Sequence, residues 1–461
     1  MTDRFRPTEA TPAAPAPDTS TLGARGLPVP ATRLGRIARL GGVASGIAGV
    51  AALNGARQLA RGQRPALPGL LLTPTNITRL TDELARMRGA AMKLGQLISM
   101  DTGEVLPAEI ATIMARLRAE AHPMPPKQLR RVLDAAWGPG WLARFAGFQT
   151  TPIAAASIGQ VHRARTRDGR DLAIKVQYPG IRRSIDSDVD NVATLIRLSG
   201  LLPRGLDLAP LMAEAKRQLR DEADYAQEGA HLARFGTLLE GNEGLHVPRL
   251  HADLTTPDVL AMDHAAGVPV ESLTDAPQET RDSVVARLVG LLLAELFDFR
   301  LMQTDPNFAN YRYDPGTDRV VLLDFGATRA LPAELAEGYR ALLAAGLDGA
   351  PGAIETAARR LGLIGPELPA AHLAALMRMA EIAFAPLRFP APVDVAALDL
   401  SRRLRGIGAE LGTDLFAPGA LSHVPPMDTL FVQRKLGGIY LLAHRLRARI
   451  DMAPLLARHL A

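Results

Sequence analysis

Four polar side chains stand at places in the sequence where they could hold phosphate and a metal ion. Asp305 and Asn310 are five residues apart in QTDPNFAN, and Asp324 follows a hydrophobic run in VVLLDFG. Lys175 lies in the apolar run LAIKV. A carboxylate and an amide oxygen are hard ligands that suit Mg²⁺, and a lysine ammonium group attracts phosphate oxygens. Each stretch alone is a common turn or core strand, but together they indicate a Mg-nucleotide site.

The order of these stretches matches a template for phosphoryl transfer. In protein kinases a loop G-x-G-x-x-G-x-V, a strand lysine, an Asp-x4-Asn loop and Asp-Phe-Gly follow one another along the chain. The sequence therefore predicts an α+β, two-lobed protein-kinase-like fold with ATP as the ligand. The residues predicted to cover its phosphates are Ala154, Ala155, Ala156, Ser157, Ile158, Gly159 and Val161.

Alanine in place of the first two loop glycines restricts this loop. Its Cβ bars backbone conformations that glycine permits, so we expect Ala154 and Ala156 to hinder closure over phosphates and transfer to another protein. After Asp324 the chain passes almost directly into TRALPAELAEGYRALL, without a long activation segment or an A-P-E element. Little surface is expected for a peptide substrate.

Two further parts of the template are less defined. Met262 and Asp263 in VLAMDH are predicted to form the hinge that meets adenine, with a buried core strand as the alternative. Gln303 and Thr304 replace the His-Arg of the kinase catalytic loop. A role for Asp305 as base or as metal partner therefore stays open.

Hydrophobic patterns predict the elements that position these residues. A turn at Asp168 and Gly169 between short apolar runs predicts the β-hairpin that carries Lys175. From Asn76, a plausible helix cap, apolar residues recur at helical spacing to about residue 100. Further helices are expected over 208–240, over 282–301 and through most of the chain after residue 330.

Composition limits the class of protein. The 461 residues are 47% apolar and 22% charged, which is typical of a globular chain with two lobes. The absence of cysteine excludes disulfides and thiolate metal sites and indicates a reducing compartment. A net charge of +5 favours anionic partners. Nucleic acid is not expected among them, because the arginines are dispersed and no basic patch interleaves aromatics.

The amino-terminal segment resembles neither a folded domain nor a secretory signal. Its first thirty residues are rich in Pro, Ala and Thr and lack hydrophobic periodicity, which predicts disorder. The apolar run Leu40–Leu53 is too short to span a bilayer, and arginines flank it on both sides. We expect a cytoplasmic protein with peripheral contact at the inner face of the cytoplasmic membrane, the alternative being a docking helix.

Five motifs together resemble the UbiB/AarF atypical kinase-like family, and most closely its branch of mitochondrial coenzyme Q kinase-like proteins. They are RMRGAAMKLGQ, AAASIGQVH, DEADYAQEG, MQTDPNFANY and RKLGG, and the match covers roughly residues 76–450. The domains then expected are a possibly membrane-associating tail over 1–72, a helical extension over 73–150, an N-lobe over 151–265 and a mostly helical C-lobe over 266–461.

The resemblance also implies roles for charged residues outside the kinase template. Lys93 and Gln96 belong to the KxGQ motif, on a helix that in relatives folds over the site and would gate it. Glu222 and Asp224 form the ExD motif, which in relatives engages the KxGQ lysine. Glu228 is implied to pair with Lys175. On one continuous helix Glu222 and Glu228 would point about 120° apart, so a single helix could serve both lysines.

The function that the resemblance implies is Mg-ATP binding with slow ATP hydrolysis in support of ubiquinone biosynthesis. Lys175 would hold the α and β phosphates, Asn310 and Asp324 would hold magnesium, and Asp305 would position the attacking water or hydroxyl. Membrane lipid, quinone-biosynthesis enzymes and a second copy of the chain are the further partners considered.

Two alternatives remain at this point. One is a phosphotransferase that acts on a small molecule or a prenylated quinone precursor, and the other is a pseudokinase scaffold that organises quinone-biosynthesis enzymes. Retention of Lys175, Asp305, Asn310 and Asp324 argues against a dead scaffold, but it does not separate hydrolysis from transfer.

Overall fold

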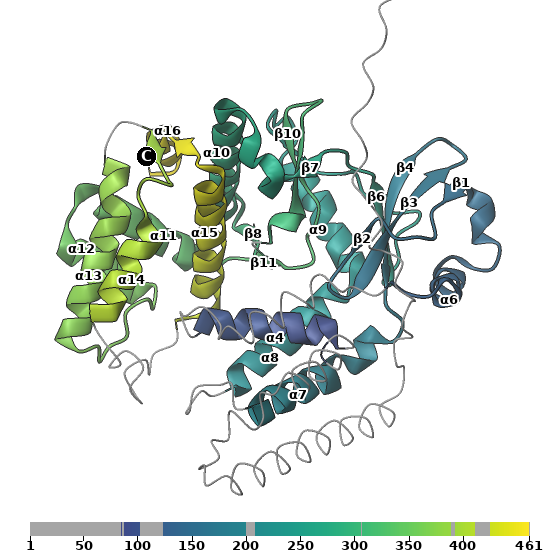
Figure 1. Cartoon of the computed structure of the whole chain (residues 1–461), viewed down its shortest axis with the longest axis horizontal. Coiled ribbons are helices and arrows are strands. Elements are labelled where there is room, and N and C mark those ends of the chain that lie inside the picture. Colours follow the sequence, from purple (N-terminus) through teal and green to yellow (C-terminus); the bar gives the residue numbers. More distant parts are fainter. Residues whose placement is uncertain are drawn as a thin grey trace, which may run out of the picture.

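The computed structural model describes residue 84 and residues 87–101, 123–199, 208–305, 307–388, 392–410 and 425–460. Within them the chain has the predicted α+β kinase-like fold, with a small lobe built on a five-stranded sheet and a larger, mostly helical lobe (Figure 1). The predicted tail over 1–72 and the helix start at Asn76 lie outside the described residues.

The small lobe is an antiparallel sheet in the order β1-β3-β4-β6, with β2 paired to β3. Its strands are β1 (Phe145–Phe148), β2 (Ala154–Ala155), β3 (Gly159–Thr166), β4 (Asp171–Gln177) and β6 (Val259–Asp263). The predicted hairpin is the β3–β4 pair, and Gly169 takes a φ of 91° in its turn. The sheet begins at Phe145, before the lobe boundary expected at residue 151.

Alternation along β4 decides which way the strand lysine points. Successive side chains of a strand face opposite sides of the sheet. Leu172, Ile174 and Val176 belong to a small core that also holds residues of α6 (Pro126–Trp137), whereas Ala173 belongs to the main core on the other side. Lys175 therefore points toward the large lobe.

Four helices complete the small lobe. They are α4 (Arg88–Asp101), α7 (Ile181–Ser199), α8 (Ala209–Glu222) and α9 (Tyr225–Leu238). Three of them, α4, α7 and α8, lie beneath the sheet in the view of Figure 1. Helix α4 packs on α7 and α8, and its Leu94 and Leu97 are fully buried. Helix α9 lies against β6.

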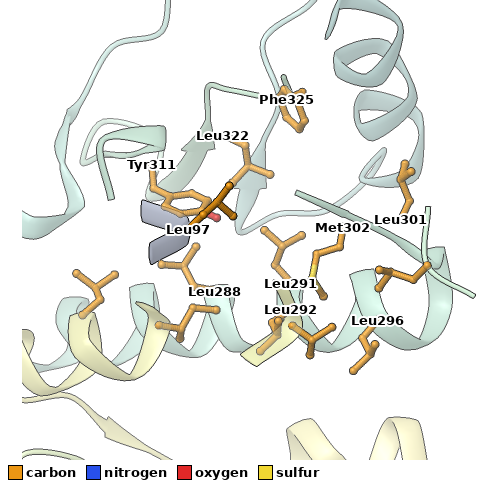
Figure 2. Close-up of a cluster of buried hydrophobic side chains, with 14 of the residues drawn as sticks. Leu97, Leu288, Leu291, Leu292, Leu296, Leu301, Met302, Tyr311, Leu322 and Phe325 are labelled. Atoms are coloured by element: carbon orange, nitrogen blue, oxygen red, sulfur yellow. The ribbon is translucent and has the colours of Figure 1, made fainter. Parts of the chain in front are cut away.

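The large lobe begins with a buried helix and the short strands that carry the predicted catalytic loop. Helix α10 (Gln278–Ala294) continues into a π-helical turn, η3 (Glu295–Phe299), and into β8 (Leu301–Gln303). Figure 2 shows leucines of α10, among them Leu288, Leu291 and Leu292, on the side that faces Tyr311 and Leu322. The elements that follow are η4 (Phe308–Asn310), β9 (Tyr311–Asp314), β10 (Arg319–Leu322) and β11 (Thr328–Ala330).

Short ladders hold these segments together. A second sheet has the order β5-β10-β9-β7, with β5 (Leu245–His246) parallel to β10 and β7 (Val268–Pro269) antiparallel to β9. Strand β8 precedes the Asp-Phe-Gly stretch in the chain, β11 follows it, and the two strands pair with each other. The segment before Asp305 and the segment after Asp324 are thus bound side by side.

The carboxyl-terminal part is helical, as the pattern after residue 330 predicts. Its elements are α11 (Ala333–Asp348), α12 (Pro351–Arg360), α13 (Ala370–Phe384), η5 (Ala385–Arg388), β12 (Val393–Asp394), α14 (Leu400–Glu410), α15 (Met427–Leu446), β13 (Arg449–Ile450) and α16 (Met452–Leu460). Helix α15 packs along α10, so its residues reach the centre of the lobe. In the described part of the chain, Ala370–Arg388 is long and apolar enough to cross a membrane.

Candidate nucleotide site

A cavity of about 580 Å³ lies where the two lobes meet. It is lined from the small lobe by the alanine-containing loop, Lys175, Met262 and Asp263, and from the large lobe by Asp305, Asn310 and Asp324. Lys93 and Glu222 also reach its wall. Of the predicted site residues whose side chains are described, Glu228, Gly159 and Asp224 do not line it.

Lys175 is the best-defined charge in this cavity. Its Nζ lies 2.8 and 2.9 Å from the two carboxylate oxygens of Glu228 and 3.2 Å from Asp324 Oδ2. The side chain is 7% exposed and stands 5.0 Å from the centre of the Tyr225 ring. Burial alone would lower the pKa of Lys175, but the carboxylates of Asp324 and Glu228 raise it well above its usual value. Lys175 is therefore a fixed cation.

Glu228 anchors Lys175 from helix α9. Only 1% of this residue is exposed, and burial raises its pKa to about 7, an effect that the neighbouring ammonium of Lys175 opposes. Such a buried carboxylate is held in place by its partner, because removing one member of a buried pair leaves an uncompensated charge. The pairing implied by the family resemblance is thus present in the structure.

The single helix assumed for Glu222 and Glu228 is wrong. Helix α8 ends at Glu222, and α9 begins at Tyr225. Asp224 causes the break, since its Oδ1 accepts hydrogen bonds from the N–H groups of Ala226 (3.1 Å) and Gln227 (3.2 Å) as the N-cap of α9. The two glutamates serve two lysines from two helices.

Asp224 does not join the site. Its side chain is half exposed, and Arg182 is the cation beside it, at 4.0 Å. In the described residues it makes no contact with Lys93, so the role expected for Asp224 in the ExD pair is corrected to helix capping.

Of the two ExD carboxylates, only Glu222 pairs with Lys93. This lysine is buried in α4 and forms an ion pair with Glu222 Oε1, while Glu222 Oε2 accepts a hydrogen bond of 2.8 Å from Ser157 Oγ. Burial lowers the pKa of Lys93, but Glu222 and then Asp305 outweigh this and raise it. One carboxylate therefore joins α4 to the tip of the loop over the cavity.

Close packing reinforces this junction. A Cβ added at Gly89 of α4 would stand 2.9 Å from Ile158 Cγ2 and 3.3 Å from the carbonyl oxygen of Ser157. Glycine at residue 89 therefore lets α4 lie directly on the loop. Gln96 lies in α4, and its side chain is outside the described residues.

Asp324 and Asn310 both line the cavity. Asp324 Oδ1 accepts a hydrogen bond of 3.0 Å from the Gly326 N–H, and the side chain is 36% exposed. Burial alone would raise the pKa of Asp324, but Lys175 and the Gly326 N–H outweigh this effect and lower the pKa below its usual value. The carboxylate is therefore ionised at neutral pH. The backbone carbonyl of Asn310 accepts a hydrogen bond of 2.9 Å from the Leu323 N–H. This bond holds the segment of Asn310 against the segment that leads to Asp324.

These two side chains fit a magnesium ion that shares nucleotide phosphates. Mg²⁺ is usually bound by one or two protein oxygens and completes its octahedral shell with phosphate and water. Among the described residues, no group of three or more His, Cys, Asp or Glu side chains could hold a metal by itself. The donor set accordingly suits a nucleotide-bound ion better than a resident metal.

Asp305 faces a cation that sequence reasoning missed. Arg434, from the RKLGG motif on α15, lies 3.4 Å from Asp305 Oδ1 through its Nη2. Tyr225 was also missed, although its ring lies beneath the Lys175 ammonium. The signal available for both was their place in motifs DEADYAQEG and RKLGG, which indicates importance without indicating the contact.

The predicted hinge is a buried strand that reaches the cavity. Met262 on β6 pairs with Ala173 on β4. The Asp263 carboxylate contacts the His251 ring nitrogen Nε2 at 2.7 Å and accepts from the Arg249 N–H at 3.3 Å. Contact of this strand's backbone with adenine stays a prediction.

The loop predicted to cover the phosphates is a β-hairpin, which explains its single glycine. Ala154 pairs with Val161, and the Ala156 N–H donates to the Gly159 carbonyl at 2.9 Å. None of these residues takes a positive φ, so alanine is accommodated. At Gly159 an added Cβ would stand 2.4 Å from the Val176 carbonyl oxygen and 2.7 Å from the Tyr225 hydroxyl.

A kinase-like nucleotide-binding protein is the class that this fold and site define. Residues 116–354 match the family model described as the ABC1 atypical kinase-like domain. The sequence is 36% identical to atypical kinase COQ8, mitochondrial, of Saccharomyces cerevisiae, over 93% of this chain and 84% of that protein. It is 35% identical to atypical kinase COQ8B, mitochondrial, of Rattus norvegicus, over 92% and 79%.

More distant proteins agree. The probable protein kinase UbiB of Pseudomonas putida is 28% identical over 57% of this chain and 50% of its own length. The solved structure of the Rv3197-erythromycin complex from Mycobacterium tuberculosis shares the fold, with a TM-score of 0.58, 23% identity and coverage of 82% of this chain and 93% of that one. The chain belongs to the ABC1 atypical kinase-like family, and specifically to the COQ8/UbiB atypical kinases.

The expected cytoplasmic location is contradicted by these comparisons. The yeast and rat relatives are both named as mitochondrial proteins. The expectation rested on the absence of cysteine and on net positive charge, which indicate a reducing compartment and anionic partners. Neither property separates the cytoplasm from the interior of an organelle.

The packing at Gly159 gives a testable prediction. Gly159→Ala should destabilise the protein by about 1–3 kcal/mol, because the new Cβ meets the backbone carbonyl of Val176 and cannot be relieved by a side-chain movement. Ala156→Gly is the control on the same hairpin and should change the free energy of unfolding by less than about 1 kcal/mol. Urea denaturation of both variants measures this, and equal stability of Gly159→Ala and the wild type would contradict it.

Proposed function

We propose that the chain binds Mg-ATP between its lobes, hydrolyses it slowly, and thereby supports ubiquinone biosynthesis. The observation that carries the nucleotide part is the Lys175 ammonium, held between Glu228 and Asp324 on the cavity wall. ATP use is implied by membership of the family. The ubiquinone part is supported by the resemblance to COQ8 and UbiB proteins.

Each charged residue then has a chemical task. Lys175 holds phosphate oxygens, Glu228 keeps Lys175 in place, and Asp305 positions the attacking water or hydroxyl. Asn310 and Asp324 hold magnesium, which when bound neutralises charge on the phosphates. The alanine-containing loop covers the phosphates, and Met262 and Asp263 adjoin the base.

Hydrolysis is favoured over transfer to a protein by the position of α4. This helix packs on the loop at Gly89, and its Lys93 reaches the cavity wall, where it raises positive charge near Asp305. An acceptor peptide would need the volume that α4 occupies. Lys93, together with Gln96 on the same helix, is therefore proposed to gate the site.

Contacts beyond the nucleotide are a further part of the proposal. The substrate of this pathway is a prenylated quinone precursor, so peripheral contact with membrane lipid and with quinone-biosynthesis enzymes follows from the proposed role. The arginine-flanked run Leu40–Leu53, on which membrane contact rests, lies outside the described residues. A homodimer stays a prediction.

The metal assignment can be tested by hydrolysis. Asp324→Asn should reduce the Mg²⁺-dependent ATPase rate at least about a hundredfold, because it removes a charged magnesium ligand and one partner of Lys175. Asp314→Asn, a surface aspartate on β9 outside the cavity, should keep the wild-type rate. Phosphate release from purified proteins measures both, and an unchanged rate in Asp324→Asn would refute the assignment.

The pathway assignment needs a separate test in cells. In a strain that lacks the chromosomal copy, the wild-type gene should restore ubiquinone, whereas Asp324→Asn and Lys93→Ala should not. Quinone extraction and mass spectrometry measure this, with immunoblots to show equal protein levels. Normal ubiquinone in the deletion strain or with Asp324→Asn would remove the pathway from the proposal and leave the ATPase in place.

A further inference from the structure

The RKLGG motif on α15 holds a buried lysine, Lys435, in addition to Lys93 and Lys175, and the nucleotide site does not use it. Lys435 is 1% exposed and forms an ion pair with Glu295, which is 0% exposed. Glu295 opens the π-helical turn that ends α10. Burying two charges costs desolvation energy, and an apolar pair of similar volume is often no less stable. A positional role would account for the pair.

Glu295 connects the Lys435 ion pair to the start of the predicted catalytic loop. Its Oε1 accepts a hydrogen bond of 3.2 Å from the N–H of Gln303, the last residue of β8. The short π-helical turn places the carboxylate of residue 295 beneath residue 303. The position of β8 is therefore tied to α15 as well as to its partner strand β11.

Gln303 carries the connection to the metal-binding segment. This side chain is 3% exposed, its Nε2 donates to the backbone carbonyl of Asp324, and its Oε1 accepts a bond of 2.7 Å from the Tyr311 hydroxyl. Both halves of the amide are thus satisfied, and the carbonyl acceptor fixes which end is the nitrogen. Gln303 occupies the place of histidine in the kinase H-R-D sequence.

Neighbouring bonds hold the same segment at both ends. The Thr304 N–H and hydroxyl both donate to the Ala327 carbonyl, at 3.0 and 2.7 Å, and the Leu323 N–H donates to the Asn310 carbonyl at 2.9 Å. Between the bonds at Ala327 and at Leu323, the Gln303 side chain makes the hydrogen bond to the backbone carbonyl of Asp324 itself. A shift of that carbonyl moves the Asp324 side chain relative to Asn310.

We propose that Gln303, supported by the buried Lys435–Glu295 pair, is a positioning residue that sets Asp324 for magnesium. It acts through the backbone of Asp324 and touches neither nucleotide nor metal. RKLGG thereby gains a role: it supports the metal ligand from α15, some 110 residues further along the sequence. This inference rests on the proposed function, since it concerns the same Mg-nucleotide site.

The test compares magnesium-dependent and magnesium-independent binding in Gln303→Met, which keeps the volume and removes both hydrogen bonds. Calorimetric titration with the non-hydrolysable analogue AMP-PNP, with and without Mg²⁺, gives the two affinities. The affinity gained from Mg²⁺ should fall about tenfold, whereas affinity without Mg²⁺ should stay within about twofold. The Mg²⁺ concentration for half-maximal ATPase should rise in parallel.

Two further variants separate positioning from general packing. Gln303→His supplies a donor and an acceptor at the same place and should recover most of the affinity gained from Mg²⁺. Gln433→Met removes another amide–tyrosine contact, the partly buried 3.2 Å bond from Gln433 to the Tyr339 hydroxyl, and should leave both affinities unchanged. If Gln303→Met does not fold, Tyr311→Phe should show the same selective loss, smaller in size.

The outcomes distinguish this inference from the proposed function. If wild-type protein neither gains affinity for AMP-PNP from Mg²⁺ nor hydrolyses ATP, the proposed function fails. If the wild type does both and the Gln303 and Tyr311 variants match it, or lose both affinities equally, the positioning role is overturned.

Discussion

The buried ammonium group of Lys175 is the interaction on which the site depends. It lies between Glu228 from helix α9 and Asp324 from the large lobe, so one cation connects three elements of two lobes. Breaking a buried pair by removing one partner typically costs about 3–5 kcal/mol, because the remaining charge is left without compensation. Loss of Lys175 would leave two carboxylates facing each other. The lysine therefore sets the relation between the lobes as well as the charge offered to a phosphate.

A second buried ion pair defines what distinguishes this site from that of a protein kinase. Lys93 and Glu222 fasten α4 to the loop proposed to cover the phosphates, through the Ser157 hydroxyl and the close contact at Gly89. The alanine residues of the loop are then part of a regular hairpin and not a defect in a flexible one. A nucleotide would meet a loop that is already held by the helical extension. This arrangement suits retention of ATP and restricts access for a protein acceptor.

Much of the fold and of the site could be predicted because short motifs encode local geometry. The Asp-Gly turn and the alternation around Lys175 indicated the hairpin, and the ordered motifs indicated that Asp305, Asn310 and Asp324 would meet across one cavity. The break between α8 and α9 was missed, because a run of acidic residues reads as one helix unless Asp224 is recognised as a cap. The predicted cytoplasmic location was wrong, because amino-acid composition indicates a reducing environment and anionic partners but does not identify the compartment.

Contacts between distant segments could not be read from the sequence at all. Nothing local at Gln303 points to the carbonyl of Asp324, and nothing at Lys435 points to Glu295, because these pairs depend on how α10 and α15 pack. The reason for glycine at residue 159 could not be read from the sequence either. Glycine is required there because Val176 and Tyr225 leave no room for a Cβ, and not because the backbone takes a turn conformation that a motif would show.

Direct binding of ATP tests the central claim, that Lys175 is the cation that receives the phosphates. Calorimetric titration of AMP-PNP in the presence of Mg²⁺ should show wild-type binding that Lys175→Met weakens at least about tenfold, with adenosine binding unchanged because it lacks phosphate. Lys216→Met, which removes an ion pair between α8 and Asp190 of α7 at a residue that does not line the cavity, should bind as the wild type does. Equal affinity of Lys175→Met and the wild type for AMP-PNP would contradict the account.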